Sequence, residues 1–297
     1  MIDLSRSDPG VTHISKFIEV NGVRLHYLEW ENDGPPLLIL HGNSHSGGVF
    51  APLAERLAPG FHVFSLDLRG HGLSQRPGIY TWAAFREDVT DFIDRLDLRE
   101  LLLVAHSRGG GLALLTAAAR SDRVRGVVAY EPTIPTYDSL RTRLPDLVQR
   151  TLNRRAVFAS RDDMFQHFRH RGAFATWQDE FLRAYVEHGV IETEDGGVTL
   201  ANPVEVEAQM YETMLDPTEW QGIKDCTVPV LTVYGERNER LREGNDPMLT
   251  LRRHFTNVRM QLQAGSTHSG PMEYPDLFAT AIKDFASEIS PPSPSVL

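Results

Sequence analysis

Residues 101–111 read LLLVAHSRGGG. The run from Leu101 to Ala105 holds no polar residue, which is typical of a parallel strand covered on both faces. A segment rich in Ala and Leu follows, so Ser107 stands where a strand turns into a helix. A turn this tight strains the serine backbone and tolerates only small residues two positions away, here Ala105 and Gly109. The stretch therefore predicts a nucleophile elbow; the alternative is an ordinary glycine-rich turn, such as one that holds a phosphate.

Apolar runs of the same kind recur along the chain, and most are separated by amphipathic segments of helical period. This alternation predicts an α/β domain built on a parallel sheet. The clearest helix is expected between Trp82 and Leu98, where apolar residues repeat at helical spacing. Asn21-Gly22 suits the type I′ turn of a hairpin between the first two strands. The predicted strands are Phe17–Val20, Val23–Trp30, Leu37–Leu40, Phe61–Leu66, Leu101–Ala105, Gly126–Tyr130, Val230–Tyr234 and Val258–Leu262.

The strand–helix rhythm stops between Glu131 and Lys224, where the sequence is helix-like and rich in Arg, Phe and Trp. We interpret this segment as a helical cap inserted into the α/β domain. The predicted division is a core of residues 1–131 and 225–290, a cap of residues 132–224 and a disordered tail of residues 291–297. The tail is assigned because its Ser-Pro sequence cannot form the interior of a helix or a strand.

Length, charge and cysteine content narrow the class of protein. The 297 residues allow one large α/β domain with a cap, and a formal charge of −10 argues against a nucleic-acid partner. Cys226 is the single cysteine, which excludes an intrachain disulfide and suits a reducing compartment. No stretch has the pattern of a secretory signal or a membrane span, so a cytoplasmic location without a membrane partner is expected.

Three further motifs follow predicted strands. His41-Gly42-Asn43 comes after the strand at 37–40, the segment Asp67–Ser74 follows the next strand, and Ala264–His268 follows the last one. Together with the turn at Ser107, this order resembles the α/β-hydrolase superfamily, with matching motifs from about residue 17 to residue 289. The resemblance implies an α/β-hydrolase fold: a mostly parallel eight-stranded sheet flanked by helices, with an inserted helical cap.

The same resemblance implies roles for individual residues. Ser107 would be the nucleophile and His268 the general base, because a serine hydroxyl needs an imidazole to remove its proton at neutral pH. The backbone N–H groups of Asn43 and Arg108 would form the oxyanion hole. Two interpretations are open for the Arg108 side chain: it binds an anionic substrate group, or it forms a surface or structural ion pair.

The acidic member of the triad is open between three glutamates. Most superfamily members take it from the loop after the penultimate strand, at a point where this chain has Asn238, and a neutral amide cannot stabilise imidazolium by charge. Glu131 ends the strand that follows the nucleophile's strand, as in haloalkane dehalogenases and certain lactone hydrolases. We therefore favour Glu131 over Glu236 and Glu239, with a salt bridge to an arginine as its alternative role. The resemblance to dehalogenases fails at Ser107, because those enzymes require an aspartate nucleophile.

No metal or cofactor is expected. The chain has twelve histidines, but neither a His-Glu-x-x-His motif nor paired ligands at metal spacing. His41, His71 and His106 lie inside the motifs named above, where packing in tight turns or hydrogen bonds to the backbone are the expected roles.

Aromatic residues and methionines crowd the predicted cap and supply apolar surface above Ser107. Most of them are expected to pack the cap helices, because aromatics at helical spacing usually belong to a core. Phe168, Trp177 and Met214 are predicted to contact substrate.

These features predict a serine hydrolase that cleaves a carboxylic ester or lactone of a small to medium, partly apolar substrate through an acyl-enzyme. Acyl-CoA thioester hydrolysis, C–C bond hydrolysis and perhydrolysis use similar machinery and stay open. A ligand receptor on the same scaffold is the alternative outside enzymes. The expected partner is a small-molecule substrate, and the protein is expected to be a monomer or a homodimer.

Overall fold

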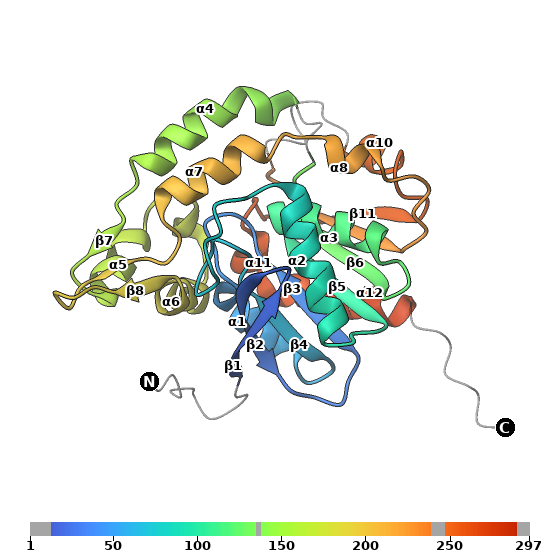
Figure 1. The fold of residues 1–297 in the computed structure, drawn as a ribbon, viewed down its shortest axis with the longest axis horizontal. Helices are drawn as coiled ribbons and strands as arrows, with labels where there is room; N and C mark the ends of the chain where they lie inside the picture. Colours follow the sequence, from blue (N-terminus) through green and yellow to red (C-terminus); the bar gives the residue numbers. More distant parts are fainter. Residues whose placement is uncertain (1–12, 135–137, 239–246, 290–297) are drawn as a thin grey trace.

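The computed structural model describes residues 13–134, 138–238 and 247–289. Within these ranges the main sheet has eight strands in the order β1-β2-β4-β3-β5-β6-β10-β11 (Figure 1). Strand β2 is antiparallel to both of its neighbours, and every other adjacent pair is parallel. The predicted mostly parallel eight-stranded sheet is therefore confirmed. Its strands are β1 Ile14–Val20, β2 Val23–Trp30, β3 Pro36–Leu40, β4 His62–Leu66, β5 Leu101–His106, β6 Val124–Tyr130, β10 Val230–Gly235 and β11 Val258–Gln263.

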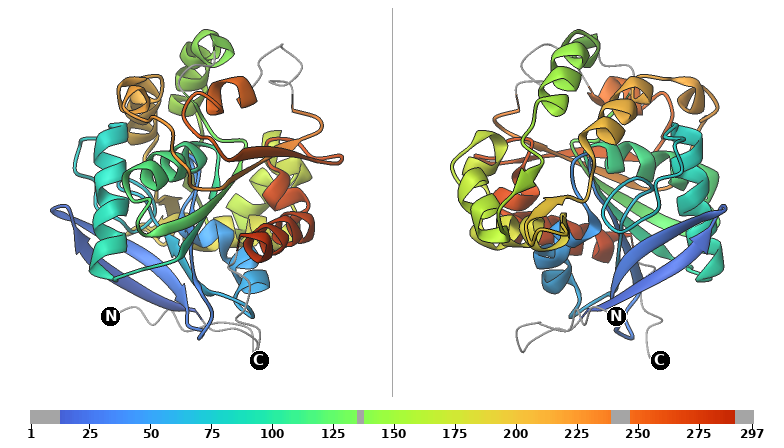
Figure 2. Two further views of the ribbon diagram at one scale, coloured as in Figure 1. Left: turned by 90° about the vertical axis from the view of Figure 1, so that its right-hand side faces the viewer. Right: turned by 60° about the vertical axis from the view of Figure 1, so that its left-hand side comes forward.

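Helices cover both faces of this sheet. Figure 2 shows α2 and α3 on one side of it and α1 and α12 on the other. The core helices are α1 Ala51–Leu57, preceded by the 3-10 helix η1 Gly47–Phe50, then α2 Trp82–Arg95, α3 Arg108–Ala119, α10 Pro247–Leu251, α11 Gly270–Glu273 and α12 Pro275–Glu288.

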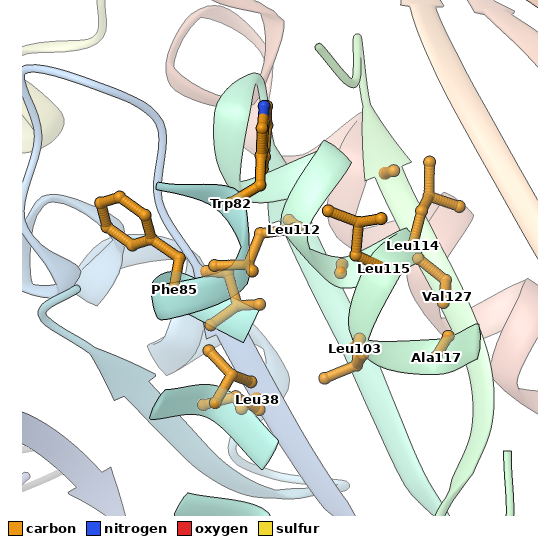
Figure 3. Packing of buried hydrophobic residues seen from close by; sticks show 14 of the residues in the cluster. Leu38, Trp82, Phe85, Leu103, Leu112, Leu114, Leu115, Ala117 and Val127 are labelled. Carbon is orange, nitrogen blue, oxygen red and sulfur yellow. The ribbon is translucent and has the colours of Figure 1, made fainter. Parts of the chain in front are cut away.

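The apolar runs of the central strands are explained by burial on both faces. In β3, Leu38 packs into the cluster that contains Phe85 of α2 and Leu112 of α3, together with Leu103 of β5 (Figure 3). The neighbouring Ile39 belongs to the cluster on the opposite face. Because successive side chains of a strand point to opposite faces, a strand covered on both sides buries nearly all of its side chains and favours apolar residues throughout.

Of two local predictions, the hairpin turn is confirmed, and the helix predicted at residues 82–98 is present but ends earlier. Asn21 and Gly22 have φ angles of 47° and 71°, so the hairpin between β1 and β2 turns as the sequence predicts. Helix α2 starts at Trp82, and the side chain of Thr81 accepts a hydrogen bond from the Ala84 N–H. It ends at Arg95 rather than Leu98, and Asp97 adopts a left-handed φ of 46° just beyond it.

The segment between β6 and β10 contains helices together with a small sheet that the sequence analysis does not anticipate. Its three short strands pair antiparallel in the order β7-β9-β8. Helices α4 and α7 run side by side in Figure 1. All these elements fall inside the predicted cap range of 132–224; the division into core and cap remains a prediction, and residues 291–297 lie outside the described part. The elements are α4 Asp138–Leu152, β7 Val157–Phe158, α5 Arg161–Phe168, η2 Gly172–Thr176, α6 Asp179–His188, β8 Val190–Glu192, β9 Val198–Leu200, α7 Val204–Thr213 and α8 Thr218–Gln221.

None of the helices in the described ranges is long and apolar enough to cross a lipid bilayer.

Candidate active site

Ser107 stands at the turn from β5 into α3 with a strained backbone. Its φ and ψ are 56° and −120°, values that cost a non-glycine residue on the order of 1–3 kcal/mol. Hydrogen bonds pin the residue from both sides: its N–H donates to the Tyr130 carbonyl at 2.9 Å, and its carbonyl accepts from the Thr133 N–H at 2.8 Å. The elbow geometry expected from the sequence is therefore present, and neighbouring strand β6 holds the strained turn.

The requirement for a small residue at Gly109 is steric. A Cβ atom there would lie 2.3 Å from the Leu40 carbonyl oxygen and 2.5 Å from that of His41. Both atoms belong to the backbone that leads out of β3, so they cannot move aside as the end of a flexible side chain would. The elbow and the loop after β3 thus pack backbone against backbone.

The substitution Gly109→Ala is expected to lower the free energy of unfolding by about 2–3 kcal/mol, because the added methyl group overpacks this contact. Urea denaturation of both proteins measures the difference. Gly60→Ala is the matched control, since the nearest atom to its added Cβ would be the Leu57 carbonyl oxygen at 4.0 Å. Equal denaturation midpoints for the two variants would contradict the steric argument.

The three side chains predicted as a triad form one chain of hydrogen bonds. The Ser107 hydroxyl lies 3.1 Å from Nε2 of His268, and Nδ1 of His268 lies 2.6 Å from Oε2 of Glu131. Glu131 is 1% exposed, and its other oxygen accepts from the Gly235 N–H at 3.0 Å. The carboxylate is therefore fixed between strand β10 and the imidazole.

The other carboxylates considered for the triad do not take this place. Oε2 of Glu236 accepts from the Gly265 N–H at 2.9 Å, which directs it to the loop after β11. Glu239 lies outside the described residues. Asn238, which stands where most superfamily members have their acid, is buried.

The loop after β3 lies against Ser107. A Cβ atom on Gly42 would be 3.0 Å from Cβ of Ser107, so the backbone of the next residue, Asn43, passes beside the serine. His41 braces this loop: its Nδ1 donates to the Gly42 carbonyl at 2.7 Å, and its Nε2 accepts from the Leu68 N–H at 3.0 Å. Arg108 is the first residue of α3, where backbone N–H groups have no partner within the helix. The two predicted oxyanion donors thus flank Ser107.

Comparison with known proteins identifies the family. A sequence model of the alpha/beta hydrolase fold matches residues 35–236. The 2-(acetamidomethylene)succinate hydrolase of Mesorhizobium japonicum is 30% identical over 233 residues, which are 76% of this chain and 79% of that protein. The chain belongs to the α/β-hydrolase family.

Two further similarities agree with this assignment. The N-formylmaleamate deformylase of Pseudomonas putida is 31% identical over 174 residues, which are 57% of this chain and 62% of the relative. The crystal structure of E-2-(acetamidomethylene)succinate hydrolase superposes with a TM-score of 0.80 at 25% identity and covers 93% of this chain and 100% of that one. The matched family model and the similar protein of Mesorhizobium japonicum, which is named a hydrolase, show that the chain is a hydrolase. They do not identify the bond that it cleaves.

The Arg108 side chain of this α/β hydrolase has a role that neither interpretation of the sequence describes. It is 1% exposed and donates to the carbonyls of Met210 at 2.8 Å and Tyr80 at 3.1 Å. Its guanidinium lies over the rings of Trp82 and Phe85. Burial lowers the pKa of Arg108 to about 9. The side chain therefore links the elbow to backbone carbonyls of other segments, a long-range contact that has no signature in the sequence.

A row of ring contacts leads from Trp177 to His268. Trp177 meets His45 with ring centroids 5.5 Å apart, His45 stacks on His106 at 5.7 Å, and His106 meets His268 at 4.8 Å. Nε2 of His106 also donates to the His268 carbonyl at 2.9 Å. Burial, with smaller contributions from His41, His268 and Arg154, lowers the pKa of His45 to about 3, so His45 is neutral at pH 7. Sequence reasoning missed His45, because one histidine in a loop carries no pattern.

The three residues predicted to contact substrate lie in different surroundings. Trp177 packs against His45, which lies two residues after Asn43 in the loop that follows β3. Phe168 is enclosed by cap rings such as Phe174 and Tyr185. Met214 belongs to the hydrophobic cluster on the α2–α3 face, and its carbonyl accepts from the Trp82 indole at 3.1 Å. Contact of these three residues with substrate stays a prediction.

Metal-binding side chains do not gather in the described part of the chain: no three His, Cys, Asp or Glu residues lie close enough together there to hold an ion.

Proposed function

We propose that this protein is a serine hydrolase that cleaves a carboxylic ester or lactone through an acyl-enzyme on Ser107. The observation that carries the proposal is the continuous hydrogen-bond chain from the Ser107 hydroxyl through His268 to Glu131, with distances of 3.1 Å and 2.6 Å. A hydroxyl, an imidazole and a buried carboxylate in this order are the groups that acyl transfer to water requires.

In the first half of the reaction, Oγ of Ser107 attacks the substrate carbonyl carbon while Nε2 of His268 takes the hydroxyl proton. Glu131 keeps the second proton of the imidazole on Nδ1 and stabilises the imidazolium by its charge. The carbonyl oxygen becomes an oxyanion and accepts from the N–H groups of Asn43 and Arg108. Collapse of this intermediate breaks the ester bond, and His268 protonates the departing alkoxide.

In the second half, a water molecule takes the place of the alcohol. His268 removes a proton from this water, whose oxygen attacks the acyl carbon, and the same imidazole then returns the proton to Oγ of Ser107. The products are a carboxylic acid and an alcohol, or a single hydroxy acid when the substrate is a lactone. No cofactor takes part in this sequence.

A second candidate is the cleavage of an N-acyl bond by the same residues. Two of the similar proteins are named for acetamidomethylene and N-formyl compounds, both of which carry an acyl group on nitrogen. An amine leaves less readily than an alcohol, so this activity depends more strongly on protonation by His268.

The proposed class of substrate follows from the apolar residues of the cap. We expect a small to medium, partly apolar substrate, because the rings around Trp177 and Phe168 supply apolar surface. A small-molecule partner, a cytoplasmic location and a monomeric or homodimeric state complete the proposal.

Labelling with a fluorophosphonate, followed by peptide mass spectrometry, tests the proposed function. The probe reacts with a serine only when a base and an oxyanion hole activate it. We expect one adduct, on Ser107, together with hydrolysis of short p-nitrophenyl esters or of small lactones. A panel that includes a thioester and an N-acyl compound ranks the bond types. Absence of labelling and of turnover on the whole panel would support a receptor instead.

A further inference from the structure

A buried carboxylate from the cap contacts the loop that carries the proposed oxyanion donor. Glu207 lies on α7 and is 1% exposed. Its Oε1 accepts a hydrogen bond from the Ser44 hydroxyl and another from the Tyr211 hydroxyl at 3.1 Å. Its Oε2 pairs with Nη2 of Arg154 at 2.5 Å. Residues 163 positions apart thus meet at the edge of the site.

Ser44 is the residue directly after Asn43, and its backbone is strained. Its φ of 66° is in the left-handed region, which a serine adopts only when its surroundings impose it. The hydrogen bond from Ser44 to Glu207 is a contact of this kind. The Asn43 N–H belongs to the peptide between Gly42 and Asn43, which is joined to the Asn43–Ser44 peptide through Cα of Asn43. A shift of Ser44 is therefore passed to the Asn43 N–H through the backbone dihedral angles of a single residue.

Burying the Glu207 carboxylate is costly unless its charge is compensated. Arg154 supplies the opposite charge from the segment after α4, and the two hydroxyl groups supply hydrogen bonds. Both Arg154 and Glu207 come from the insertion, whereas Ser44 comes from the core. The cap therefore brings an electrically balanced acceptor to the core loop.

A second contact from the same helix is made with the side chain of Arg108, whose backbone N–H is the other proposed donor. The carbonyl of Met210, one turn after Glu207 on α7, accepts from Nη1 of Arg108 at 2.8 Å. The same nitrogen lies 3.5 Å from Oδ1 of Asn43. Helix α7 thus contacts both the residue after Asn43 and the side chain of Arg108.

We propose that Glu207 is a positioning residue for the oxyanion hole: by accepting the Ser44 hydrogen bond, it holds the Asn43 N–H at the place where the oxyanion develops. The proposal rests on the proposed function. It implies that the site is complete only while α7 packs on the core, and that the cap contributes to the rate of acylation as well as to substrate binding.

Three single variants and one double variant, Ser44→Ala with Glu207→Gln, test this proposal. Ser44→Ala removes the hydrogen bond and leaves Arg154 and Tyr211 on the carboxylate. Glu207→Gln removes the charge that strengthens the bond. Glu205→Gln is the matched control, because Glu205 is an exposed acid on the same helix. The measurements are kcat and KM for an activated ester, the Kd of a trifluoromethyl ketone that mimics the tetrahedral intermediate, and the Tm.

We expect Ser44→Ala and Glu207→Gln each to lower kcat by about 10- to 100-fold, since a small displacement of one oxyanion donor loses stabilisation in the transition state only. KM should change by less than about threefold, and the ketone should bind more weakly by a factor similar to that in kcat. The double variant should be no slower than the slower single variant, because both substitutions act on the same contact: one removes the donor, and the other weakens the acceptor. Glu205→Gln should match the wild type.

Two results separate the possible failures. Unchanged kcat and ketone affinity in Ser44→Ala and Glu207→Gln, with or without a lower Tm, would mean that Glu207 only stabilises the fold, and would overturn this inference alone. Wild-type protein that neither hydrolyses the ester nor binds the ketone would overturn the proposed function, and this inference with it.

Discussion

The Ser107→Ala variant is expected to hydrolyse its substrate with a kcat/KM about 10⁴- to 10⁶-fold below that of the wild type. Under the proposed mechanism no acyl-enzyme forms without this hydroxyl. His268 also loses the group, 3.1 Å from its Nε2, from which it would take a proton. What remains is the contribution of substrate binding and of the oxyanion donors, which act on a direct attack by water. Steady-state kinetics on an activated ester, with enzyme concentrations raised to match, measure the loss.

The control for this variant is Ser287→Ala, which removes an exposed hydroxyl whose hydrogen bond goes to the Lys283 carbonyl on the same helix, α12. Its kinetics should equal those of the wild type. Retention of more than about a tenth of the activity by Ser107→Ala would rule out the serine mechanism, because in triad enzymes loss of the nucleophile costs several orders of magnitude.

Local patterns explain how much of the fold could be predicted. The strands were predictable because burial on both faces leaves uninterrupted apolar runs such as Leu101–Ala105. The elbow was predictable because its steric demands extend over only a few residues, from Ala105 to Gly109. The strands β7, β8 and β9 were not, since two or three residues are too few for a period to be recognised.

Contacts over long separations explain what the sequence did not predict. The guanidinium of Arg108 binds the carbonyl of Met210, 102 positions away, and any residue offers a carbonyl. Glu207 of α7 accepts a hydrogen bond from Ser44, and local periodicity does not fix where α7 packs on the core. The position of Glu131 could be proposed because it follows directly from the end of β6, one strand beyond the nucleophile's strand.

The Glu131→Gln variant is expected to lower kcat by about 10³- to 10⁴-fold. The glutamine keeps the shape of the side chain, and its carbonyl oxygen can still accept the Gly235 N–H that now donates to Oε1. Its amide group would then face Nδ1 of His268 in place of Oε2, which lies 2.6 Å away. An amide N–H donates rather than accepts, so it favours the tautomer with the proton on Nε2, which cannot act as a base toward Ser107.

Glu236→Gln serves as the control that separates the two candidate acids. Its carboxylate accepts from the Gly265 N–H and does not reach the imidazole, so we expect kcat within about twofold of the wild type. Fluorophosphonate labelling rates should follow the same order, because formation of the adduct also requires His268 as base. A larger loss of kcat in Glu236→Gln than in Glu131→Gln would reverse the assignment. The acid would then lie after β10, as in most of the superfamily, and the bond between Glu131 and His268 would serve only to orient the imidazole.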